Sequence, residues 1–99
     1  MSPVNILAAV AKAGEVTVAD LQGPGRARRY SYPRHVAIVL MHDRYGLNFT
    51  SIARRLGNRH YETVKEAYER TKARLPYSIE HAYLLEEAQS LLPPAPAET

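Results

Sequence analysis

The 99-residue sequence contains no cysteine and no tryptophan, and its hydrophobic runs are short. Without cysteine the chain can form no disulfide, offers no thiol nucleophile and cannot bind zinc through thiolates. The longest apolar runs, Ile6–Ala11 and Val36–Met41, have six residues each. A membrane-spanning helix needs roughly 20 apolar residues. The opening residues MSPVN also lack the basic and apolar regions of a signal peptide. We therefore expect a cytoplasmic protein without a membrane partner.

The residues that are present indicate one small domain. A length of 99 residues and a hydrophobic content of 45 % are ordinary for a globular unit with a single core. The exception is the tail PPAPAET, because its prolines oppose a helix. We expect a single domain over residues 1–92 and a flexible Pro/Ala tail over residues 93–99.

Charge is distributed unevenly along the chain. Residues 1–59 contain nine Lys/Arg and three Asp/Glu, a net charge of +6, whereas residues 60–99 contain four and seven, a net charge of −3. A basic front half is typical of a chain that presents one face to a polyanion such as DNA. The alternative is an uneven but merely solvated surface.

The spacing of apolar residues predicts an all-α fold. Pro33 is expected at the first position of a long central helix, with Gly46 just past its end. The next helix is expected to be capped by Asn48. A later helix begins at about Arg59 or His60 and ends at Leu75. The prediction is a small bundle of five or six helices that contains a helix–turn–helix.

Other helix signals lie near the two ends of the chain. Thr17 and Asp20 form a capping-box pattern before a second, brief helix. Ser78 is expected to cap a final helix, with Leu84, Ala88, Leu91 and Leu92 on its buried side. Because histidine is a poor cap, His60 favours an earlier start of its helix at Asn58.

Three segments, in order, carry a family resemblance. "VADL" is followed, after eleven residues, by "PRHVAIVL" and then by "LNFTSIARRLGNRHYETVKEA". Their order and spacing resemble the DNA-binding C-terminal domain of DnaA, the bacterial replication initiator, over about Asn5 to Leu75. The resemblance implies a helical bundle with a long helix before a helix–turn–helix. No stretch ends in Gly-Lys-Ser/Thr as a phosphate-binding loop would, so we expect a stand-alone relative without the ATPase module or a bound nucleotide.

The family signature around the reading helix is only partly retained. The family has Gly-Gly-Arg-Asp-His-Thr-Thr-Val, whereas residues 57–64 read GNRHYETV. The resemblance implies that Asp-His-Thr carries much of the base reading, and His60, Tyr61 and Glu62 replace it here. We therefore expect altered or relaxed sequence specificity. A carboxylate is repelled by phosphates but can accept from a cytosine N4 amine, so Glu62 either reads a cytosine or points to solvent.

The residues predicted to bind DNA come from three segments of the chain. The resemblance places Arg26 in the minor groove beside the recognition site and Arg34 at a DNA contact. Guanidinium groups suit phosphate oxygens and narrow minor grooves. In a helix–turn–helix only the first turn of the second helix reaches base edges. The predicted set is Arg26, Arg28, Arg29, Arg34, His35, His42, Asn48, Thr50, Arg59, His60, Tyr61, Glu62, Thr63 and Lys65.

We expect neither an enzyme nor a protein that depends on a metal or cofactor. The four histidines show no pairing with carboxylates at metal-ligand spacing, and no Ser/His/Asp arrangement stands out. The predicted function is control of replication initiation or transcription by a nucleoid-associated protein that binds double-stranded DNA. The alternative is a protein-interaction module. In that case the acidic residues Glu80, Glu86 and Glu87, or the surface of Tyr61 and Glu62, contact the replication initiator or another regulator.

Overall fold

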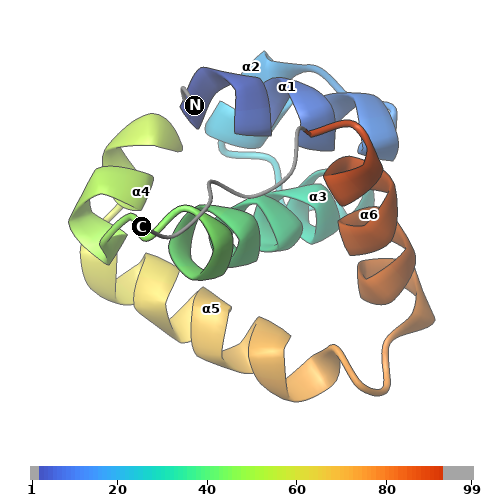
Figure 1. Cartoon of the computed structure of the whole chain (residues 1–99). Coiled ribbons are helices and arrows are strands. Elements are labelled where there is room, and N and C mark those ends of the chain that lie inside the picture. The colour runs from blue at the N-terminus through green and yellow to red at the C-terminus, as the bar shows by residue number, and fades with distance from the viewer. Residues whose placement is uncertain (1–2, 93–99) are drawn as a thin grey trace, which may run out of the picture.

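Six α-helices and one π-helical turn form the described part of the chain, residues 3–92, in the computed structural model (Figure 1). They are α1 Pro3–Gly14, α2 Val18–Gln22, α3 Arg28–Val39, the π-helical turn η1 Leu40–Arg44, α4 Phe49–Arg55, α5 Tyr61–Arg74 and α6 Ile79–Ser90. No strand occurs among these residues, which confirms the all-α prediction of five or six helices. The predicted tail lies outside the described residues.

The central helix is buried, as its apolar sequence predicts. All residues of the run Val36–Met41 are buried, and they continue from α3 into η1. Figure 1 shows α3 in the middle of the molecule, with α1 on one side and α5 on the other. Helices α1 and α6 pack against α3 and each other, whereas α5 packs against α3 and α4. The core thereby leaves the first turn of α5 at the surface.

Side-chain caps at three predicted residues fix where α2, α4 and α6 begin. Thr17 and Asp20 form the predicted capping box of α2, with both hydrogen bonds 3.0 Å long. The Asn48 side chain accepts from the Ser51 amide at 2.8 Å before α4. Ser78 caps α6 by accepting from the His81 amide. The three predicted caps are therefore confirmed. Each one satisfies a backbone amide that has no partner within its helix.

Pro33 lies inside α3, and the prediction that it opens the helix was wrong. The helix begins at Arg28, and the amides of Tyr30 and Ser31 donate to the carbonyl of Ala27 at 2.9 Å each. Pro33 is buried against α1, so closely that a Cβ added to Gly14 would come within 2.7 Å of its ring. Tertiary packing therefore holds a proline at an interior position that its missing amide would disfavour.

Helix α5 begins at Tyr61, within one residue of the predicted start at Arg59 or His60, but the alternative start at Asn58 was wrong. His60 is the N-cap, and its Nδ1 accepts from the Glu62 amide at 3.2 Å. Asn58 lies in the preceding turn with a positive φ of 57°, so it cannot begin the helix as expected. Asparagine tolerates this conformation, and histidine then performs the capping that the sequence would assign elsewhere.

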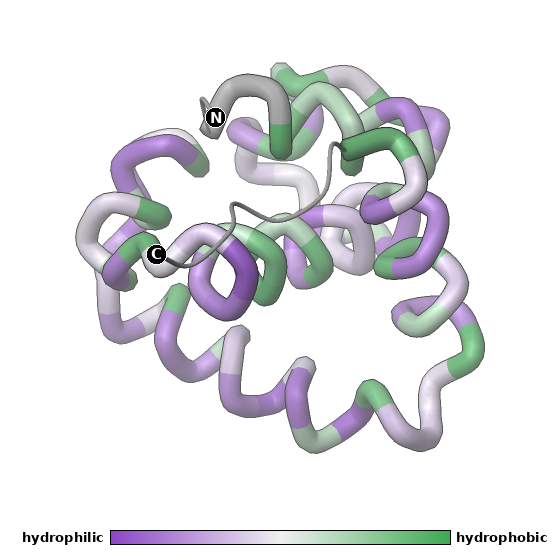
Figure 2. The backbone as a smooth tube through the Cα atoms, in the orientation of Figure 1, coloured by the Kyte–Doolittle hydropathy of each residue, from purple (hydrophilic) through white to green (hydrophobic). Residues whose placement is uncertain are grey.

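Helix faces follow the apolar pattern with one exception. In α5 Val64, Ala67 and Thr71 are buried, and in α6 Ala88 is buried. Leu91 is exposed although it was predicted on the buried side. Figure 2 shows hydrophilic residues along much of α5. None of the described helices has the length and hydrophobicity needed to cross a membrane.

Candidate nucleic-acid interface

Arg34 holds the loop between α2 and α3 in shape. Only 8 % of this residue is exposed, and its guanidinium group donates to four backbone carbonyls. The acceptors are Leu21 at 2.8 Å, Gly25 and Asp20 at 3.0 Å, and Gly23 at 3.1 Å. The sequence prediction gave Arg34 a direct DNA contact. Its donors instead satisfy two carbonyls at the end of α2 and two in the loop that follows.

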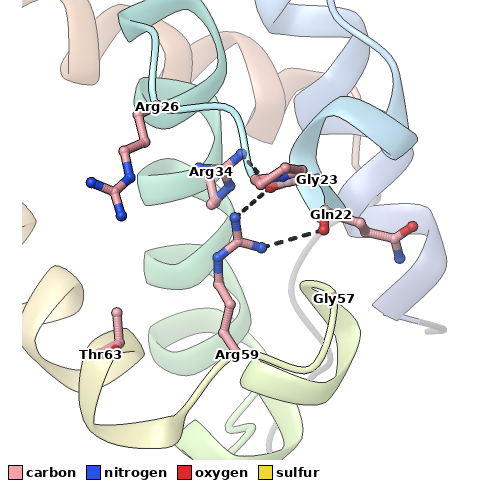
Figure 3. Close-up of a pocket in the computed structure, with 8 residues that line it drawn as sticks. Gln22, Gly23, Arg26, Arg34, Gly57, Arg59 and Thr63 are labelled. Carbon is pink, nitrogen blue, oxygen red and sulfur yellow. Dashed lines mark hydrogen bonds between the residues drawn. The ribbon is translucent and has the colours of Figure 1, made fainter.

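Arg59 joins this loop to the turn before α5. Its Nη2 donates to the Gly23 carbonyl at 2.5 Å (Figure 3). Its Nη1 donates to the Leu56 carbonyl. Gly57 has a φ of +81°, and a Cβ added there would lie 2.1 Å from the Gln22 carbonyl oxygen. A glycine is required at this close approach between two backbones. The loop between α2 and α3 is therefore held against the helix–turn–helix, which consists of α4, the turn at Gly57 and α5.

This junction forms a hollow of about 460 Å³ that is lined by three arginines. It is lined by Gln22, Gly23, Pro24, Arg26, Arg34, Gly57, Arg59 and Thr63. Figure 3 shows Arg26 extending from the loop before α3 and Thr63 projecting from α5 toward the same space. We call this space the arginine hollow. The lining of this hollow thus brings the loop before α3 and the first turn of α5 onto one surface, as a shared DNA contact would require.

A second hollow of about 290 Å³ lies beside the first and shares its arginines. Ser31, His35 and Arg70 add polar groups there, over an apolar floor that includes Ile38 and Val64. No Asp or Glu lines either hollow among the residues that the structure describes. The two hollows therefore form a continuous surface of positive charge without a carboxylate to neutralise it.

Burial lowers the pKa of the two enclosed arginines of the arginine hollow. Burial, together with the charge of Arg59, lowers the pKa of Arg34 to about 10. Burial also lowers the pKa of Arg59. Both groups remain protonated at neutral pH and donate to the same Gly23 carbonyl. An anion placed in the arginine hollow would relieve this unbalanced charge.

The first turn of α5 presents a second set of polar groups. Tyr61, Glu62, Thr63 and Lys65 are exposed. The Tyr61 ring stacks on His60 with centroids 5.0 Å apart, and the Tyr61 hydroxyl donates to Glu62 Oε1 at 3.3 Å. These contacts orient the Glu62 carboxylate at the start of the helix. Its oxygens can still accept hydrogen bonds from a donor outside the protein.

Two of the predicted loop arginines are placed elsewhere. Arg28 forms an ion pair with Glu80 of α6 at 3.5 Å and lies over the Tyr32 ring. Arg29 lies over the ring of Tyr30. Both line a different hollow, on the side of α3 that packs against α1 and α6. The prediction grouped them with Arg26, but the helical start at Arg28 turns them away from the arginine hollow.

The histidines differ in their surroundings. His35 Nδ1 lies 3.2 Å from His81 Nε2, and burial and His81 lower its pKa to about 4. His35 is therefore neutral at pH 7 and adds no charge toward a phosphate. His42 Nδ1 bonds to the Leu47 carbonyl at 2.9 Å, and its ring stacks on Phe49. His42 thus supports the packing of η1 on α4.

Two predicted residues lie at the start of α4, and the site also contains residues that the prediction missed. The Asn48 side chain is used as the cap, whereas Thr50 is exposed in the first turn. The missed residues include Ser31 and Arg70, which line the second hollow. Arg70 lies seven residues after Thr63 on the same face of α5. That spacing is the signal that would have placed it.

Comparison with known proteins identifies the domain. A family model described as the bacterial DnaA protein helix–turn–helix matches residues 3–71. A chromosomal replication initiator protein DnaA from Thermomicrobium roseum is 35 % identical over 75 residues, which are 76 % of this chain and 16 % of that protein. Another from Bifidobacterium animalis subsp. lactis is 34 % identical over 67 residues, or 68 % of this chain and 12 % of that protein. The chain thus spans less than a fifth of the length of these relatives. The match covers α1 through most of α5, including both hollows, and the chain belongs to the bacterial DnaA helix–turn–helix family.

Proposed function

We propose that the chain binds double-stranded DNA through the arginine hollow and the first turn of α5. The observation that carries the proposal is the convergence of Arg26, Arg34, Arg59 and Thr63 on one hollow without a lining carboxylate. Arg26 is exposed, so it can leave the surface and enter a minor groove. The exposed first turn of α5 then lies in the adjacent major groove. Family membership supports DNA binding in general.

The arginines act in different ways in this proposal. Arg34 and Arg59 use most of their donors within the protein, so they supply charge and hold the loop. Arg26 supplies the mobile contact. Each phosphate that such groups neutralise releases condensed counterions, and affinity then falls with salt by a log–log slope of about −0.9 per phosphate. Three to five phosphate contacts would give a slope of about −3 to −5.

We assign the recognition of DNA bases to the first turn of α5. Tyr61 holds the Glu62 carboxylate through its hydroxyl, and that carboxylate accepts from the N4 amine of a cytosine. Because His60, Tyr61 and Glu62 replace Asp-His-Thr, we propose an altered target site. The cell would use such a protein to control replication initiation, or transcription near replication sites.

Fluorescence anisotropy with a random-sequence duplex tests DNA binding at two salt concentrations. We expect Arg26→Ala to weaken binding about tenfold or more and to reduce the salt slope by about 1. Arg74→Ala is the matched control, because it removes one exposed arginine from the far end of α5. Absence of binding at low salt, or an equal loss in both variants, would contradict the proposal and favour a module that binds only protein.

Selection from a random duplex pool tests the role of Glu62. We expect the wild-type protein to select a cytosine at one position and Glu62→Thr to lose that preference. A good base contact contributes about 1–3 kcal/mol of discrimination, which such a selection resolves easily. An identical motif for both proteins would show that Glu62 faces solvent and reads no base.

A further inference from the structure

An exposed hydrophobic surface toward the C-terminal end of the described chain has no role in the proposed DNA binding. Tyr77 is 88 % exposed, Ile79 is 86 % exposed and Tyr83 is 60 % exposed. All three belong to α6 or to the turn that precedes it. They also lie beyond residues 3–71, the range matched by the family model. The family match therefore carries no information about them.

The packing of α6 against the core determines which face of this helix is exposed. Its other face buries His81, Ala88 and the following Leu92, with Leu84 and Leu85 partly buried against the core. Ile79 and Tyr83 are one turn apart on the exposed face, and Glu86 and Glu87 follow on the next turn. The exposed face thus has an apolar first half and an acidic second half.

Side-chain contacts of His81 fix the start of α6 against α3. His81 Nδ1 lies 2.7 Å from the Ser78 hydroxyl, and the His81 ring stacks on Tyr32 with centroids 4.0 Å apart. A hollow of about 470 Å³ opens beside this cluster, between the end of α5 and the start of α6. It is lined by Tyr32, Arg74, Tyr77, Ser78, Ile79 and Glu80. This hollow is large enough to receive an apolar side chain.

The charge of α6 indicates what kind of group fits beside the apolar residues. Residues 79–92 contain three glutamates and no lysine or arginine. Glu80 is paired with Arg28, whereas Glu86 and Glu87 form no ion pair within residues 3–92. An acidic surface of this kind repels nucleic acid and attracts cations. A complementary occupant carries both apolar and basic side chains.

We propose that this surface, defined by Tyr77, Ile79, Tyr83, Glu86 and Glu87, binds a basic amphipathic helix of another protein. An apolar side chain of that helix enters the hollow beside Ile79, and its Lys or Arg residues pair with Glu86 and Glu87. The proposal is independent of DNA binding, because α6 contributes no residue to the arginine hollow. One chain can therefore hold such a partner while it is bound to DNA.

Two other occupants fit the charge less well. Two copies that paired through α6 would bring six glutamates of this helix together, with like-charge repulsion between them. The chain's own residues 93–99 carry one glutamate and no lysine or arginine. Neither α6 of a second copy nor residues 93–99 supplies a lysine or arginine to pair with Glu86 and Glu87.

Binding of two synthetic helical peptides to the full chain tests the proposal. One peptide contains only leucine and lysine in an amphipathic order, and the other has glutamate at each lysine position. Titration followed by amide NMR should show that the lysine peptide binds and shifts signals of Ile79, Tyr83, Glu86 and Glu87. Ile79→Ser/Tyr83→Ser should weaken the peptide about tenfold or more, as expected for apolar anchors. DNA affinity should remain unchanged.

Matched variants distinguish binding at this surface from non-specific peptide binding. Glu86→Gln/Glu87→Gln should weaken the lysine peptide about threefold or more, whereas Glu66→Gln/Glu69→Gln removes the same charge from α5 and should change nothing. Equal binding of both peptides, or signal shifts confined to other helices, would overturn the proposal. Dimerisation in sedimentation velocity that Tyr83→Ser abolishes would assign the surface to a second copy instead. Nuclear Overhauser contacts from residues 93–99 to Tyr83 would assign it to the chain's own tail.

Discussion

Lowering the pH from 7.5 to 5 should reduce the free energy of unfolding, because the folded protein keeps His35 neutral. His35 Nδ1 lies 3.2 Å from His81 Nε2, between α3 and α6. Burial and His81, with smaller contributions from Arg70, Arg34 and Arg74, lower the pKa of His35 from 6.5 to about 4. The unfolded chain therefore binds this proton more readily than the folded one. The stability that His35 contributes is present above pH 6.5 and is lost as the pH falls toward 4.

The size of the effect follows from these two pKa values. A shift from 6.5 to about 4 corresponds to a loss of about 2 kcal/mol in the free energy of unfolding between pH 7.5 and pH 5. His35 is partly exposed, and solvent screening reduces the expected loss to about 1 kcal/mol. That is a large share of the roughly 5–10 kcal/mol expected for a domain of this size.

Urea denaturation at several pH values measures this loss. Carboxylates such as Asp43 also titrate at low pH, so the informative quantity is the difference between the wild-type protein and His35→Gln. We expect the variant to lose about 1 kcal/mol less than the wild-type protein between pH 7.5 and pH 5. If both proteins lose stability in parallel over that range, His35 is not held neutral by its surroundings, and the reasoning fails.

Three further predictions concern the backbone around the arginine hollow. Arg34→Ala should reduce the free energy of unfolding by about 2–4 kcal/mol in thermal denaturation, because it removes the arginine's hydrogen bonds to four carbonyls at the end of α2 and in the following loop. Gly57→Ala should cost several times more than Gly46→Ala in urea denaturation. Both glycines have positive φ, but only Gly57 lacks space for a Cβ, and Gly46→Ala should cost about 1 kcal/mol. Thr17→Ala should cost about 1 kcal/mol by the same assay, since it removes the cap of α2, and an unchanged midpoint would contradict this.

Local signals made the helical fold predictable from the sequence. Thr17, Asn48 and Ser78 have side chains that accept hydrogen bonds from amides three residues later, so their caps depend on few other residues. The apolar run Val36–Met41 specifies a buried segment in almost any helical bundle. The helix–turn–helix segments retain enough of the family pattern to be recognised even though His60, Tyr61 and Glu62 depart from it.

The same kind of reasoning failed where turn conformation and tertiary packing decide the outcome. His60 caps α5 because Asn58 adopts a positive φ in the preceding turn. Pro33 is tolerated inside α3 because Gly14 of α1 leaves room for its ring. The exposed surface of α6 could not be predicted either, because the apolar residues Ile79 and Leu91 look like core residues until the helix is packed.

By itself the sequence determined the helix order, the main caps, the buried central segment and the membership of a DNA-binding family, because these depend on spacing and on short-range hydrogen bonds. Only the tertiary structure decided the roles of the arginines. Arg26 and Arg34 are eight positions apart and chemically identical, yet Arg26 is exposed and Arg34 is enclosed by carbonyls. Those carbonyls belong to residues 9 to 14 positions earlier in the chain. Whether a guanidinium group contacts its own backbone or remains available to DNA therefore depends on how the loop folds back, which no local pattern encodes.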